Sequence, residues 1–140
     1  MLDIPFRSAK QLAADIRKKT IGCLELLDLY LARIEKYDGA LNAVVVRDFA
    51  RARSRARAAD RALSKREAWG PLHGVPMTIK ESYDVAGLPT TWGVPASKNN
   101  IAKKNAVAVD RFDAIRSLPP PGCECCRPRR SSAWRKDSAH

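Results

Sequence analysis

The sequence predicts an α/β fold that combines amphipathic helices with short strands. Three amphipathic stretches occupy positions 8–65, and the first two begin at residues with the spacing of a capping box. After Trp69 the pattern changes to turns containing Gly and Pro around short β-prone runs. The chain has 140 residues, which is enough for one domain with a modest core.

The first predicted helix spans residues 8–18. Ser8 and Gln11 have the spacing of a capping box, in which the hydroxyl accepts from a free helix N–H and the second side chain reaches back to the cap. Leu12 and Ile16, four positions apart, would lie on one face. The pattern therefore predicts a short helix that buries one side.

A longer helix is predicted to begin after Gly22, with Glu25 as the second half of another box. Gly39 is expected to end this helix, and the run from Leu41 to Val46 is β-prone and predicts a short strand. The helix carries apolar residues at the spacing of a buried stripe: Leu24, Leu27, Leu31 and Ile34.

The segment "RDFARARSRARAADRALSK" predicts a third helix that is basic but also amphipathic. Its stripe of small and apolar residues consists of Phe49, Ala52, Ala56, Ala59 and Leu63. Its arginines occupy the remaining circumference instead of one face: Arg51, Arg53, Arg55, Arg57 and Arg61. This distribution favours a solvated helix face over a nucleic-acid-binding surface.

The formal net charge of +11 is also compatible with a second class of protein, a small nucleic-acid-binding protein. A small basic protein could grip nucleic acid through the arginine helix and the cluster "RPRR" at 127–130. No aromatic residues are interleaved among the helix arginines to stack on bases, so we do not expect nucleic acid to be the partner. No run of about 18 apolar residues predicts a membrane segment. The first residues do not match a secretory signal, which predicts a cytoplasmic protein.

Turns and loops dominate the sequence after Trp69. "GPLHG" at 70–74 has turn chemistry, and His73 is interpreted as a turn residue rather than a catalyst or ligand. "VPMTI" at 75–79 predicts a short strand, with Pro76 at an edge, a first position or a bulge. "AGLPTTWGVP" predicts an ordered loop, and "NAVAVDRF" predicts a helix with Ala106, Val109 and Phe112 on one side.

Two tryptophans flank this region. Trp69 and Trp92 are interpreted as packing residues around the loop, and Trp92 could also line a pocket.

Lys80 ends the short apolar run at 75–79. A lysine in this place is usually exposed, because burying an unpaired ammonium costs free energy. If the apolar run and the following loop enclosed it, desolvation would favour the neutral amine, which can take a proton from a hydroxyl. Spacing alone leaves both interpretations open.

Four segments of the sequence are together similar to one known family. They are "GPLHGVPMTIKESYDVAGLPTTWG" at 70–93, "LELLDLYLARIEKYDGALNAVV", "ARAADRAL" and "NAVAVDRF". In this order they resemble the N-terminal signature region and flanking helices of the amidase signature family, with Asn105 where Asp is commoner. The resemblance covers about residues 8–113. It implies the N-terminal portion of the amidase-signature fold, which consists of helices and the first strands of a mixed sheet and is incomplete here.

The resemblance implies hydrolysis of amide carbon–nitrogen bonds by a Ser–Ser–Lys triad. Lys80 falls on the triad lysine, which acts as a base toward a serine held by a cis peptide bond, and that serine relays the proton from the nucleophilic serine. Backbone N–H groups then stabilise the oxyanion. The resemblance implies a small amide substrate, no cofactor and no metal, and it allows a homodimer of the complete enzyme.

Both triad serines belong, in the family, to a Gly/Ser-rich segment well downstream of the lysine. This sequence has no such segment, and neither Ser82 nor the pair Ser131-Ser132 matches it. We therefore expect Lys80 to be the one catalytic residue that carries over, and we expect the chain to be inactive alone. The segment at 70–93, which contains Lys80, does not distinguish an amidase from a glutamine-dependent amidotransferase subunit, and the subunit remains an alternative.

The sequence divides into an N-terminal part of an amidase domain at 1–113 and an aberrant tail at 114–140. The tail is rich in Pro, Arg and Cys, a composition typical of a GC-rich coding sequence read out of frame, and we expect it to be frameshifted or disordered. Cys123 and Cys126 have the C-x-x-C spacing of half a zinc site. Because the other half is missing, we expect no metal.

Overall fold

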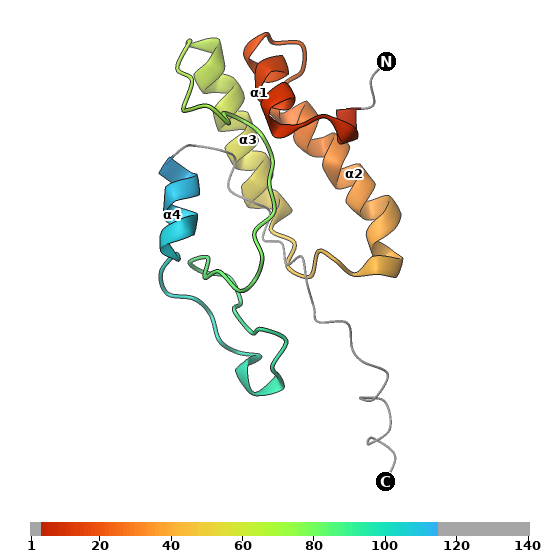
Figure 1. Ribbon diagram of the computed structural model, residues 1–140, viewed down its shortest axis with the longest axis vertical. Coiled ribbons are helices and arrows are strands. Elements are labelled where there is room, and N and C mark those ends of the chain that lie inside the picture. The colour runs from red at the N-terminus through yellow and green to blue at the C-terminus, as the bar shows by residue number, and fades with distance from the viewer. Residues whose placement is uncertain (1–3, 115–140) are drawn as a thin grey trace.

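The computed structural model describes residues 4–114. Figure 1 shows α1, α2 and α3 grouped together, with a long irregular segment leading from α3 to α4. The helices of this part of the chain are α1 (Ala9–Arg17), α2 (Cys23–Leu41), α3 (Phe49–Ser64) and α4 (Val107–Ala114), with 3-10 turns at Ile4–Phe6 and Pro95–Ser97.

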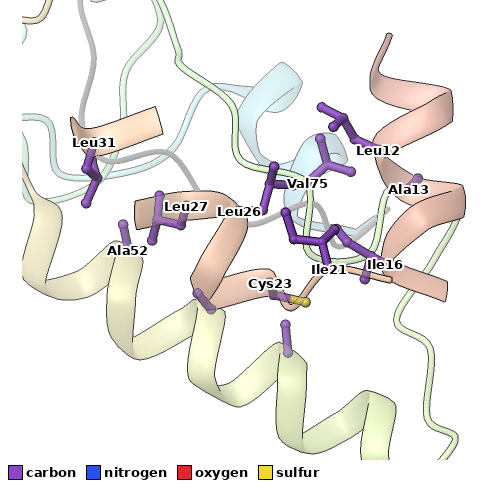
Figure 2. Packing of buried hydrophobic residues seen from close by; sticks show 12 residues of the cluster. Leu12, Ala13, Ile16, Ile21, Cys23, Leu26, Leu27, Leu31, Ala52 and Val75 are labelled. Carbon is purple, nitrogen blue, oxygen red and sulfur yellow. The ribbon is translucent and has the colours of Figure 1, made fainter. Parts of the chain in front are cut away.

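The hydrophobic core lies where α1, α2 and α3 meet (Figure 2). The alanines on one side of α3 are buried, and side chains this small let α3 lie close to α2. Val75, from the segment after α3, joins the same core. The buried members that come from the first three helices are Leu12, Ala13, Ile16, Cys23, Leu26, Leu27, Leu31, Ala52, Ala56 and Ala59.

Both predicted helix starts are confirmed. The Ser8 N–H donates to Gln11 Oε1 at 2.8 Å, and the Gln11 N–H donates back to Ser8 Oγ at 3.3 Å. At the start of α2 the Gly22 N–H donates to Glu25 Oε2 at 3.2 Å, which is one half of a capping box. Glycine has no side chain to supply the other half.

Asp60, on α3, supplies the missing cap of α2. Its two carboxylate oxygens accept from the Cys23 N–H at 2.7 Å and the Leu24 N–H at 3.1 Å. A carboxylate at a helix N-terminus satisfies free N–H groups and interacts favourably with the helix dipole. Asp60 therefore ties α3 to the beginning of α2.

Asp60→Ala is expected to lower the free energy of unfolding by about 1–3 kcal/mol, because two N–H groups at the start of α2 lose a charged acceptor. Chemical denaturation of the 140-residue chain measures this loss. The matched control is Asp28→Ala, which removes an exposed ion pair to Arg53 (2.8 Å) and should cost less than about 1 kcal/mol. Equal losses in the two variants would contradict the capping role.

Gly39 does not end α2, contrary to the sequence-based expectation. The helix continues to Leu41 and ends at Asn42, whose backbone is left-handed with φ 49°. The buried Asp38 carboxylate then accepts from the Ala43 N–H at 2.7 Å, from the Val44 N–H at 3.2 Å and from Arg47 Nη2 at 2.8 Å. Burial opposes ionisation of Asp38, but these hydrogen bonds outweigh it and lower the pKa of the carboxyl.

Neither predicted strand is present among residues 4–114. After Asn42, the backbone N–H groups of Ala43 and Val44 are taken by Asp38, which leaves them unavailable to a neighbouring strand. The segment 75–79 runs without a β-ladder, and within the described range the one β-bridge is an isolated antiparallel pair of Pro89 and Ile101. A β-prone run becomes a strand only where a second strand completes its ladder.

The arginines of α3 have mixed surroundings. Arg57 and Arg61 are exposed, as the solvated-face interpretation expects. Arg53 pairs with Asp28 on α2, and Arg55 stacks over the Trp69 ring with 5.0 Å between the guanidinium carbon and the ring centroid. Arg51 pairs with Asp48 at 2.7 Å. The side chains are thus distributed between ion pairs, an aromatic ring and water.

Candidate functional site

The turn at 70–74 joins α3 to the segment that carries Lys80. His73 is fully buried and fastens this turn to α3. Its Nδ1 accepts from the Trp69 N–H at 3.0 Å, so Nε2 carries the proton and donates to the Ala59 carbonyl at 3.1 Å. The Trp69 ring contacts the imidazole edge to face, with centroids 5.3 Å apart. This arrangement supports the interpretation of His73 as a turn residue.

Burial lowers the pKa of His73, because the charged imidazolium loses its hydration. The hydrogen bond to the Ala59 carbonyl and the charge of Asp60 oppose this shift, and Arg17 adds to it. Between the folded-state pKa and the ordinary value of about 6.5, the unfolded chain binds more protons than the folded chain. The His73 contribution to stability is therefore complete above about pH 6.5 and falls as the pH drops toward the folded-state pKa.

We expect the denaturant concentration at the unfolding midpoint of the 140-residue chain to decrease as the pH is lowered from 7.5 to 5.5. His73→Gln, which cannot titrate, should flatten this part of the pH profile while lowering stability overall. Denaturant titrations of both chains at several pH values measure the difference. An unchanged slope in the variant would show that another group causes the pH dependence.

Lys80 is exposed and lies between two buried neighbours, Ile79 and Glu81. The chain turns at once after it, because the Tyr83 N–H donates to the Lys80 carbonyl at 2.9 Å. The structure therefore presents the amine at the surface of the described part of the chain. The enclosed environment that the base interpretation requires is not formed by residues 4–114.

The Glu81 carboxylate is a feature that the sequence did not indicate. Its Oε1 accepts from both the Thr91 N–H and the Thr91 Oγ hydroxyl, each at 2.6 Å, and the side chain is buried. Nothing in the spacing of Lys80 and Glu81 shows which of the two would turn inward. The one signal in the sequence was a charged residue directly after the lysine. That signal does not show that Glu81 bonds to Thr91, ten positions away.

The two tryptophans differ in their surroundings. Trp69 packs against the core, as expected. Trp92 is 62% exposed, so the expectation of a packing role is wrong for it within the described structure. Its backbone is left-handed with φ 54° and is followed by Gly93 with φ 70°. For a bulky residue this conformation is uncommon and needs local hydrogen bonds to hold it.

The loop after Lys80 is ordered, as predicted. The Ala102 N–H donates to the Leu88 carbonyl at 3.0 Å, and the Thr90 N–H donates to the Asn100 carbonyl at 2.9 Å. Asn105, where the family more often has Asp, accepts from the Ala86 N–H at 2.8 Å and donates to Asp110 at 2.9 Å. An aspartate at 105 would place two carboxylates together here, so asparagine suits this loop.

The predicted helix after this loop is confirmed as α4, with Val109 buried and Phe112 40% exposed.

Several of the residues singled out from the sequence are not brought together. Ser82 is half-buried inside the turn formed by residues 80–83, and no second serine stands near it in sequence. Ser131, Ser132, Cys123 and Cys126 lie outside the described residues. Within 4–114, no three His, Cys, Asp or Glu side chains gather where they could hold a metal ion. None of the helices in this range combines the length and hydropathy needed to cross a membrane.

Comparison with known proteins identifies the family. A family model described as Amidase matches residues 25–115. The indoleacetamide hydrolase of Bradyrhizobium diazoefficiens is 43% identical over 102 residues, which are 73% of this chain and 20% of that enzyme. A glutamyl-tRNA(Gln) amidotransferase subunit of Methylococcus capsulatus is 35% identical over 108 residues, which are 77% of this chain and 22% of that protein.

A solved structure agrees with this assignment. The crystal structure of a bacterial aryl acylamidase of the amidase signature family superimposes with a TM-score of 0.76 and 29% identity. The superposition covers 84% of this chain and 24% of that one, and this chain spans about a fifth of the length of the two curated relatives above. The superposition supports the predicted amidase-signature fold, whereas the strands of the α/β prediction are not formed within residues 4–114. Because the family model matches more than half of the chain, the chain belongs to the amidase signature family.

Proposed function

We propose that this chain is the lysine-bearing N-terminal part of an amidase that hydrolyses amide carbon–nitrogen bonds through a Ser–Ser–Lys triad. Lys80 would serve as the general base. It takes a proton from a relay serine, which takes the proton of the nucleophilic serine as that serine attacks the amide carbonyl. The proton then passes to the leaving amine, and water releases the acyl group. Both serines would come from a segment absent from this sequence.

One observation carries this proposal. Lys80 stands at the centre of the block at 70–93, inside the region that the Amidase model matches, and it is exposed at a turn with its neighbours buried. A lysine placed in this way is available to further parts of a larger fold, which could enclose it and supply its hydroxyl partners.

The proposal is tested in a chimera. Residues 1–113 replace the segment that they match in the Bradyrhizobium diazoefficiens indoleacetamide hydrolase, about 20% of that enzyme. The chimera is assayed with indoleacetamide, the amide that the name of this relative specifies. Hydrolysis that depends on Lys80 supports the proposal, and a folded chimera without activity counts against it.

The chain alone is expected to be inactive, because it has no serine segment to accept the acyl group. Purified 140-residue protein is incubated with indoleacetamide and an aryl acylamide, and product is measured beside buffer. Robust hydrolysis that disappears in the variant Lys80→Ala would overturn the proposed inactivity while upholding the role of the lysine.

The tail at 114–140 would be unrelated to the amidase fold. The family match ends at residue 115, two residues into this tail, and the run of three prolines begins soon afterwards at 119. Translating the other two frames of the coding sequence beyond codon 102 tests this. A Gly/Ser-rich segment with two serines in another frame supports a frameshift.

An amidotransferase component is the second candidate, favoured by the 35% identity to the Methylococcus capsulatus protein. Such a protein would use the same triad to release ammonia from glutamine. A chimera with the matching part of that relative, assayed for glutaminase activity, compares the two candidates directly.

A further inference from the structure

The backbone at Lys80 is held by contacts on both sides. Ile79 and Glu81 have exposed fractions of 7% and 8%, so the two side chains that flank the exposed lysine are both anchored in the interior. The Tyr83 N–H donates to the Lys80 carbonyl at 2.9 Å and closes the turn that follows. Lys80 can therefore move little without moving Glu81.

Glu81 connects this turn to a second one ten residues later. Its Oε1 accepts two hydrogen bonds from Thr91, one from the backbone N–H and one from the hydroxyl, both 2.6 Å long. Hydrogen bonds of this length to a carboxylate are charge-assisted and stronger than neutral ones. Because the carboxylate is buried, water competes weakly for them.

Thr91 in turn organises the exposed turn that carries Trp92. The Thr91 hydroxyl donates to Glu81 and accepts from the Gly93 N–H at 3.2 Å, and the Val94 N–H donates to the Thr91 carbonyl at 2.9 Å. These bonds hold Trp92 and Gly93 in left-handed backbone conformations. A continuous path of hydrogen bonds thus runs from Glu81 to the turn.

We propose that Glu81 is a positioning residue that holds the Lys80 backbone and the Thr91–Val94 turn together as one rigid unit. Glu81 touches no reacting atom in this proposal. It fixes the position of the Lys80 backbone and the position of the Thr91–Val94 turn relative to it. The functional meaning rests on the proposed role of Lys80 as a base, whereas the mechanical coupling does not. The two can therefore fail separately.

Residue-resolved amide hydrogen exchange on the full 140-residue chain tests the coupling. In Glu81→Ala we expect the amides of Thr91, Gly93 and Tyr83 to exchange at least about tenfold faster, because loss of a charge-assisted acceptor opens both turns. Amides in α1 and α2 should keep their rates. Glu81→Gln retains an oxygen acceptor at the same reach and should restore most of the protection.

The matched control is Glu67→Ala, which removes an exposed carboxylate after α3 and should change none of these rates. If only Thr91 exchanges faster in Glu81→Ala while Tyr83 keeps its rate, the coupling to Lys80 is wrong. If Glu81→Ala fails to fold, Thr91→Val decides, because it removes one of the two bonds. Because Thr91→Val also removes the acceptor of the Gly93 N–H, the deciding amide in this variant is that of Tyr83. Faster exchange of Tyr83 supports the proposal, whereas an unchanged Tyr83 rate, or uniform acceleration throughout the chain, overturns it.

An activity measurement separates this inference from the proposed function. In the chimera described above, Glu81→Ala should lower kcat more than it raises KM, and Glu81→Gln should recover part of the loss. If the exchange results hold but Lys80→Ala leaves hydrolysis intact, the coupling stands and the role of Lys80 as a base fails. If Lys80→Ala abolishes hydrolysis but Glu81→Ala leaves the exchange rates unchanged, the role of Lys80 as a base stands and the coupling through Glu81 fails.

Discussion

Gly74→Ala is expected to lower the free energy of unfolding of the 140-residue chain by about 2–5 kcal/mol. A Cβ on residue 74 would lie 2.3 Å from Cys23 Sγ and 3.2 Å from Cys23 Cβ, which is far inside van der Waals contact. Gly74 also has φ 74°, a left-handed conformation that side chains disfavour. The turn at 70–74 therefore approaches the start of α2 as closely as it does because residue 74 is glycine.

Urea denaturation measures this loss, and Gly39→Ala is the matched control. Gly39 lies inside α2 with nothing within 4 Å of the added Cβ, so alanine there should raise stability by about 0.5–1 kcal/mol. A double variant that adds Cys23→Ala removes the sulfur and should lose less than the two single variants together. Wild-type stability in Gly74→Ala would contradict the close packing of this turn on α2.

Lys80→Ala in the chimera with the indoleacetamide hydrolase is expected to lower kcat/KM about a thousandfold or more. Removing the base from a catalytic triad leaves the nucleophilic serine protonated, and triad members act as a unit, so the loss of one removes most of the rate enhancement. Lys80→Arg should not restore activity, because a guanidinium stays protonated and cannot accept a proton.

Lys65→Ala is the control for this prediction. Lys65 is an exposed lysine at the end of α3, and its loss should leave kcat/KM unchanged. Circular dichroism of each variant establishes that the chimera is folded. If the Lys80→Ala chimera is about as active as the parent chimera, Lys80 is not a member of the catalytic triad.

Local signals in the sequence predicted the helices well. The box at Ser8 and Gln11, the start at Gly22 and the alanine stripe of α3 each depend on residues a few positions apart, which spacing alone reveals. The prediction that Gly39 ends α2 was wrong because a glycine inside a helix costs only about 1 kcal/mol, and the residues that do end the helix, Asp38 and Asn42, act through a hydrogen bond and a left-handed backbone just beyond it.

Contacts between distant residues were beyond the reach of spacing. The run at 75–79 is β-prone, but a strand needs a ladder partner, and no residue in 4–114 supplies one for it. The Glu81 bond to Thr91 and the Asp60 cap on α2 join positions that no local pattern connects. The prediction that Lys80 is a catalytic base rested on the family resemblance, because a lysine after a short apolar run does not by itself indicate a catalytic role.

Hydrolysis of indoleacetamide by the chimera tests the central claim most directly. The claim is that residues 1–113 are the lysine-bearing part of an amidase fold. It predicts a folded chimera that hydrolyses the amide, with activity lost in Lys80→Ala and kept in Lys65→Ala. A folded chimera whose rate equals that of its own Lys80→Ala variant would contradict it.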